Sequence, residues 1–125
     1  MRAPRYRVIF DPDAIAEDLA HATPAARQIG QEAVQHLGRE GILREQLRPC
    51  RAEERDGTRL PGCVKTYLPA PAGRCGMVLQ LRVDQDGPLL FCLAFGVRHP
   101  APGSQRPSVY QVADRRLHRP TQPGR

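Results

Sequence analysis

The sequence predicts an α+β domain in which a small antiparallel β-sheet packs on two N-terminal helices. The predicted order is strand, helix, helix, three strands and a short C-terminal helix. Three observations support it: apolar residues alternate near the N-terminus, two helix-start signals follow, and β-prone runs dominate after residue 62. A length of 125 residues suits one domain, which we assign to residues 1–118, and the Pro- and Gly-containing segment 119–125 is expected to be a disordered tail.

The first strand is predicted from period-two alternation. Tyr6, Val8 and Phe10 alternate with Arg7 and Ile9, as in a strand with one buried face. The alternation stops at the Asp11-Pro12 pair, where an aspartate can cap free backbone N–H groups and proline suits the first helical position.

Two helices are expected next. The first carries Ile15 and Leu19 four residues apart on one face. Thr23-Pro24 repeats the start signal, and the second helix is expected to run to about Gly38. Its core stripe is formed by Ile29, Ala33, Val34 and Leu37.

The C-terminal half is predicted to form the remaining strands. Ile42 and Leu43 fit either a helix extension or the sheet, and residues 48–59 read as a loop. Strands are expected at 63–68, at 77–83 and, after a turn at 84–87, at 89–97, the last being apolar enough for a central strand. Residues 69–73 form a connector. The Ser108–Gln111 capping box opens a helix to about Leu117.

Composition narrows the function classes. The formal net charge is +6, and all but one of the 19 basic residues are arginines. The longest apolar run, Leu89 to Val97, is too short to span a membrane, and no secretory signal is recognisable, so a cytoplasmic protein is expected. No glycine-rich phosphate loop is present, and we expect no nucleotide cofactor.

The four cysteines stand far apart in the sequence. Cys50, Cys63, Cys75 and Cys92 show none of the close pairs that structural zinc sites have, so we interpret them as small core residues. The expectation is that they bind no metal and form no disulfide.

One set of motifs resembles a known family. Arg59-Leu60-Pro61-Gly62 precedes a strand that holds Lys65, Gly96-Val97-Arg98 closes the last strand, and the segment from Val109 to Leu117 follows. These features resemble the RelE/ParE toxin superfamily over about residues 6–118, and the RelE-like branch is favoured.

The resemblance implies a bacterial type II toxin–antitoxin role with an acidic antitoxin as partner. RelE-type members cut messenger RNA in the ribosomal A site, so the implied function is a metal-independent endoribonuclease without cofactor. ParE-type members share the fold and poison DNA gyrase. A ParE-like or catalytically degenerate toxin and a basic RNA-binding module therefore remain open as alternatives.

The resemblance also implies catalytic residues. Lys65 matches the strand lysine of RelE-type nucleases, Arg98 the arginine at the end of the last long strand, and Tyr110 the C-terminal tyrosine. RNA cleavage through the substrate's own 2′-OH requires cations that stabilise the phosphorane and groups that move two protons. His99, beside Arg98, is a candidate general acid.

Two departures from the family pattern weaken the nuclease interpretation. Tyr67 stands where RelE-type enzymes carry a second strand lysine, and Met77 or Val78 stands where they carry an arginine. Arg74 in the preceding turn is the favoured substitute for that arginine, ahead of Arg82.

Further arginines are candidates for RNA binding. Arg82, Arg106 and Arg115 are assigned that role, whereas a wider set is expected to be mostly solvated: Arg27, Arg39, Arg44, Arg48, Arg51 and Arg55. Binding of an acidic antitoxin would explain the charge equally well. If the nuclease reading holds, Lys65, Arg98 and Tyr110 should meet in one basic concavity, with Lys65 and Arg98 pointing away from the N-terminal helices.

Overall fold

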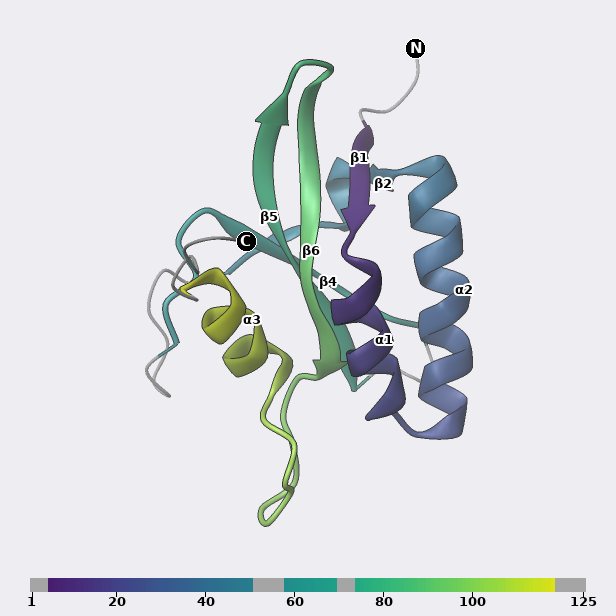
Figure 1. The fold of residues 1–125 in the computed structure, drawn as a ribbon, viewed down its shortest axis with the longest axis vertical. Coiled ribbons are helices and arrows are strands. Elements are labelled where there is room, and N and C mark those ends of the chain that lie inside the picture. The colour runs from purple at the N-terminus through teal and green to yellow at the C-terminus, as the bar shows by residue number, and fades with distance from the viewer. Residues whose placement is uncertain (1–4, 51–57, 70–73, 119–125) are drawn as a thin grey trace, which may run out of the picture.

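A six-stranded sheet with helices on both faces forms the molecule (Figure 1). The computed structural model describes residues 5–50, 58–69 and 74–118. Its elements are β1 (Arg5–Phe10), α1 (Pro12–Ala20), α2 (Pro24–Glu40), β2 (Ile42–Leu43), the 3₁₀ turn η1 (Arg44–Gln46), β3 (Arg48–Pro49), β4 (Cys63–Tyr67), β5 (Cys75–Asp84), β6 (Gly87–Val97) and α3 (Val109–Leu117).

The strand order is β2-β1-β6-β5-β4-β3, which confirms the α+β class and the central position of β6. The sheet is mixed, however, because β1 pairs with β6 in parallel while every other described pairing is antiparallel. Ile42 and Leu43 join the sheet as β2, and Arg48 and Pro49 form a short strand where a loop was expected. Residues 51–57 of that loop, residues 70–73 of the connector and the tail (119–125) lie outside the described residues.

The helix starts are those that the sequence predicts. The Asp11 carboxylate accepts hydrogen bonds from the backbone N–H groups of Asp13 and Ala14, and the Thr23 hydroxyl accepts one from Ala26. At α3, the N–H of Gln111 donates to the Ser108 hydroxyl while the Ser108 N–H donates to the Gln111 side chain, each at 3.1 Å. Such reciprocal caps satisfy backbone groups that the first helical turn leaves without partners.

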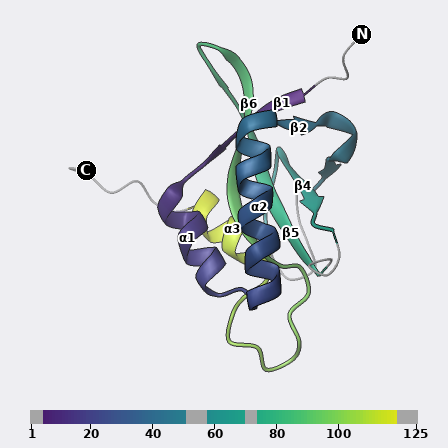
Figure 2. The ribbon, with the colours of Figure 1, turned by 90° about the vertical axis from the view of Figure 1, so that its right-hand side faces the viewer.

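Two hydrophobic cores lie on opposite faces of the sheet. On one face α1 and α2 cover residues that include Met77, Leu79 and Phe95. On the other, α3 covers Val78, Leu93 and Ala94 among others. Figure 2 shows α1 and α2 in front of the sheet with α3 behind it. No helix in the described part of the chain is both long and apolar enough to span a bilayer.

A bulge in β6 determines which side chains face α3. Val78 pairs with Ala94 but Leu79 pairs with Cys92, so Leu93 is an extra residue in β6. Because side chains alternate along a strand, one extra residue exchanges the two faces beyond it. The bulge thereby turns Gly96, paired with Gly76, toward the α3 side of the sheet.

Candidate functional site

Strand β4 presents Lys65 and Tyr67 on the α3 face of the sheet. Cys63 belongs to the core under α3, and alternation places the next two odd-numbered residues on the same side. The ammonium nitrogen Nζ of Lys65 lies 5.9 Å from the centroid of the Tyr67 ring and 5.1 Å from that of Tyr110 on α3. Both distances fall within the range of cation–π attraction, so Lys65 sits between two aromatic rings.

Arg98 reaches the same place from the end of β6. Its guanidinium carbon lies 4.1 Å from the centroid of the Tyr67 ring, and its backbone N–H donates to the carbonyl of Arg74 at 2.8 Å. Gly76 makes this approach possible, since a Cβ there would lie 3.3 Å from both Cγ and Cδ of Arg98. The glycine pair Gly76–Gly96 thus leaves room on the sheet face across which the Arg98 side chain extends.

A third cation comes from the short strand β3. Arg48 pairs directly with Lys65 in the register of β3 and β4, and its guanidinium carbon lies 5.0 Å from the Tyr67 ring centroid. Neither Arg48 nor Lys65 forms an ion pair with any carboxylate of the described residues. The result is a group of three cations and two phenol rings, which we call the cationic face: Arg48, Lys65, Tyr67, Arg98 and Tyr110.

Tyr110 is a phenol of the cationic face with a raised pKa. Burial raises the pKa of its phenol above the ordinary value, and Tyr67 adds to the rise, whereas Lys65 and Arg98 act in the opposite direction. The net direction keeps the phenol protonated at neutral pH, so it serves as a hydrogen-bond donor rather than a base. The exposed His99 ring lies beside it, with 6.3 Å between the ring centroids and 52° between the planes.

The structure therefore brings Lys65, Arg98 and Tyr110 together with His99, on the face of the sheet opposite α1 and α2. Arg74 is an exposed residue, and its backbone lies next to that of Arg98. The catalytic roles of these residues remain predictions.

The other arginines assigned to RNA lie elsewhere. Arg82 stacks on Phe91 at 4.0 Å and donates to Gln80. It lies four residues, about 13 Å along β5, from Val78, which is the partner of Lys65 in the sheet. Arg115 is exposed in the last turn of α3. Arg106 forms an ion pair with the buried Asp18 at 2.8 Å.

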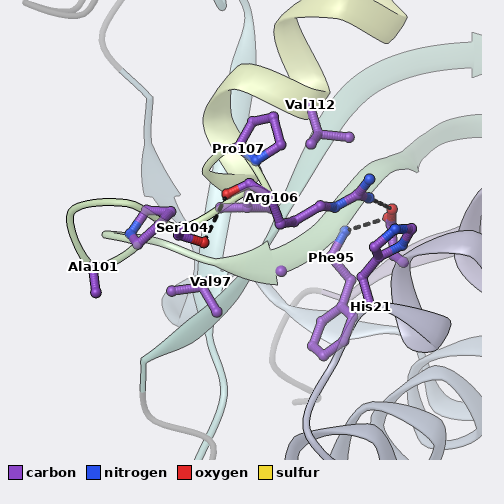
Figure 3. A pocket seen from close by; sticks show the side chains of 12 residues that line it. His21, Phe95, Val97, Ala101, Ser104, Arg106, Pro107 and Val112 are labelled. Atoms are coloured by element: carbon purple, nitrogen blue, oxygen red, sulfur yellow. Dashed lines mark hydrogen bonds and ion pairs between the residues drawn. The ribbon is translucent and has the colours of Figure 1, made fainter.

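Arg106 lines a separate cavity of about 200 Å³ beside the end of β6 (Figure 3). Its walls come from α1, β6, α3 and the segment that joins β6 to α3, and they include His21, Phe95, Val97 and Val112. No residue of the cationic face lines this cavity. Through the ion pair, Arg106 neutralises the buried Asp18, which is a structural role.

The cysteines Cys63, Cys75 and Cys92 are buried. No group of three or more His, Cys, Asp or Glu side chains that would suit a metal ion occurs among the described residues. Burial raises the pKa of the Cys63 and Cys75 thiols and raises that of Cys92 to about 12. Those three thiols are therefore protonated at neutral pH, as core residues are expected to be.

Two members of the cationic face, Tyr67 and Arg48, were not predicted as functional. Tyr67 counted as a departure from the family pattern, although its alternation with Lys65 was enough to place it on the same face. Arg48 was assigned to the solvated set, because nothing in the sequence indicates that Arg48–Pro49 pairs with β4.

No protein-family model and no curated protein matches the sequence. Among solved structures, a mutant of the E. coli toxin RelE in the free state matches with 19% identity and a TM-score of 0.45, over 91% of this chain and 99% of that one. The isolated E. coli RelE toxin matches with 22% identity and a TM-score of 0.38, over 90% and 98%.

A third match is the toxin–antitoxin complex RelBE2 of Mycobacterium tuberculosis. It has 19% identity and a TM-score of 0.44, and covers 76% of this chain and 100% of that chain. With identities and TM-scores this low, these matches assign neither a family nor an activity to this chain, and any activity has to be argued from the cationic face itself.

Proposed function

We propose that the chain is the toxin of a type II toxin–antitoxin system and cleaves ribosome-bound messenger RNA, with an acidic antitoxin as its partner. One observation supports this most: three cations and two phenols from β3, β4, α3 and the end of β6 converge on one sheet face. Such a group suits a ligand that combines phosphates with stacking bases, which is the chemistry of single-stranded RNA.

The proposed reaction uses the nucleophile of the substrate. The ribose 2′-OH attacks the neighbouring phosphorus, the bond from phosphorus to the 5′ oxygen breaks, and the products are a 2′,3′-cyclic phosphate and a 5′-OH. Negative charge accumulates on the phosphorane oxygens, where Lys65 and Arg98 would stabilise it; guanidinium groups hold such oxygens in bidentate geometry.

Two protons move in this reaction: one passes from the 2′-OH to solvent water, and one is delivered to the departing 5′ oxygen. Because its raised pKa keeps Tyr110 protonated, the phenol can donate a hydrogen bond to a phosphate oxygen or to the departing 5′ oxygen. His99, exposed next to Tyr110, is the candidate for exchanging the proton with solvent.

The proposal is tested by expression in bacteria with primer extension on messenger RNA. We expect cleavage by the wild type, and a loss of about 10²–10³ in rate for Lys65→Ala and for Arg98→Ala, because each removes one donor to the developing charge. Arg39→Ala is the matched control, since it removes one exposed positive charge in the last turn of α2, on the other side of the sheet.

The proposal fails if the wild type arrests growth with intact messenger and Arg98→Ala arrests it equally. Inhibition of a protein target such as gyrase would then be the better interpretation, because it needs no cleavage chemistry.

A further inference from the structure

We propose that Arg48 is a phosphate-binding residue of the cationic face and that Tyr67 is the positioning residue that holds Arg48 and Arg98 in place. This inference rests on the proposed function and deepens it, since it names two residues of the RNA site that the resemblance does not supply. It starts from an unfavourable arrangement of charge.

Arg48 and Lys65 are directly opposite each other on neighbouring antiparallel strands. Directly opposed side chains have Cβ atoms about 4.5–5.5 Å apart, and like charges in that position destabilise a sheet. No carboxylate of the described residues pairs with either side chain. A bound anion would balance a pair of this kind, and a phosphate suits two cations of different geometry.

Arg48, an exposed residue on a two-residue edge strand, lies near the face of the Tyr67 ring. Its guanidinium carbon lies 5.0 Å from the Tyr67 ring centroid, while that of Arg98 lies 4.1 Å from the same centroid. One ring therefore attracts two guanidinium groups that β3 and the end of β6 deliver from opposite sides of β4 and β5. Without the ring, their mutual repulsion would move the two groups apart.

Tyr67 is itself 37% exposed, so the ring and its cations form an accessible surface rather than part of a core. The row Tyr67–Gly76–Gly96 runs across three strands, and its two glycines present no side chain that would block the approach of a ligand to Arg98. A phosphate next to the one held by Lys65 and Arg98 is the ligand that Arg48 is placed to bind.

Binding is measured apart from cleavage with the purified full chain and a fluorescent RNA oligonucleotide. The RNA carries 2′-deoxyriboses throughout the tested stretch, which removes the nucleophile, and anisotropy is recorded over a range of salt concentrations. For single strands, each phosphate contact contributes about 0.7 to the slope of log affinity against log salt.

Arg48→Ala should raise Kd about tenfold and lower the slope by about 0.7. Arg44→Ala, which removes an exposed positive charge four residues earlier in η1, should leave the slope unchanged. Arg48→Lys should restore the slope, because it restores the charge. Thermal unfolding of each variant confirms that the fold is retained.

Tyr67 is tested by a pair of substitutions. Tyr67→Phe keeps the ring and should bind as the wild type does, whereas Tyr67→Leu should raise Kd about two- to fivefold. The effect of Tyr67→Leu on Kd should be smaller in the Arg48→Ala background, since the two residues act together.

The inference would be wrong if Arg48→Ala and Arg44→Ala gave equal slopes of log affinity against log salt while binding still depended on Lys65 and Arg98. That result would leave the proposed function standing. Equal binding by Tyr67→Leu and Tyr67→Phe would overturn the role of Tyr67. A wild type that binds no RNA would overturn the inference, whereas the proposed function is decided by the cleavage of ribosome-bound messenger.

Discussion

Gly76 shows how one missing side chain shapes the candidate site. It lies on β5 between Tyr67 and Gly96, and a Cβ at this position would lie 3.1 Å from the carbonyl oxygen of Thr66 as well as 3.3 Å from Arg98. The carbonyl belongs to the sheet and cannot move without disturbing its pairing with the neighbouring strand. The free space at Gly76 is therefore needed for the position of Arg98.

Gly76→Ala should destabilise the fold by about 1–3 kcal/mol and shift Arg98 off the Tyr67 ring, because the added methyl overpacks the sheet face. The measurements are chemical unfolding and RNA binding of the same variant. Gly38→Ala is the control, since a Cβ at Gly38 meets nothing within 4 Å. Unchanged RNA affinity in a folded Gly76→Ala variant would contradict the proposed position of Arg98.

At the scale of elements, a buried carboxylate on α1 binds an arginine of α3. The Asp18 side chain on α1 is fully buried and accepts hydrogen bonds from Arg106, from both terminal nitrogens of Arg116 and from the backbone N–H of Phe95. Arg116 also donates to the carbonyl of Leu93, the extra residue of the bulge. The cluster bonds the backbone of Leu93 and Phe95 in β6, past the residues of β6 that pair with β1. It also fixes the position of α3, which carries Tyr110.

Asp18→Asn should lower the free energy of unfolding by about 3–5 kcal/mol, because it leaves two arginines without their buried counter-charge. Glu17→Gln is the matched control. It removes a neighbouring carboxylate that also binds Arg116 but has a side chain 56% exposed, and exposed pairs contribute about 1 kcal/mol or less. Equal destabilisation by the two substitutions, measured by urea unfolding, would contradict the importance of the buried cluster.

Local signals in the sequence predict most of the elements. The caps at Asp11, Thr23 and Ser108 and the alternation in β4 and β5 depend on residues that are close in the chain, and the structure has them. The pairing of β3 with β4 and the burial of Asp18 depend on contacts between distant residues. The two-residue strand β3 is too short for an alternating pattern, and an aspartate on a helix, such as Asp18, is ordinarily expected to face solvent.

At the scale of the whole molecule, the sheet order explains how residues far apart in the sequence form one face. Lys65 and Tyr110 are 45 positions apart, yet β4 and α3 meet because β5 and β6 lie between β4 and β1 and leave one sheet face to α3 (Figure 1). The helices α1 and α2 occupy the other face. The three cations of the cationic face therefore lie on a single side of the sheet, where a polyanion such as RNA can reach them together.

The most direct test of the central claim is the chemistry of the cut. Purified protein is incubated with ribosomes programmed with a messenger that carries one 2′-deoxyribose at the cleaved position, and with the matched all-ribose messenger. We expect the all-ribose messenger to yield a 2′,3′-cyclic phosphate and a 5′-OH, and the single 2′-deoxy substitution to abolish the cut at that position. Cleavage of the 2′-deoxy messenger at the same position, or products that carry a 3′-OH and a 5′-phosphate, would contradict the mechanism.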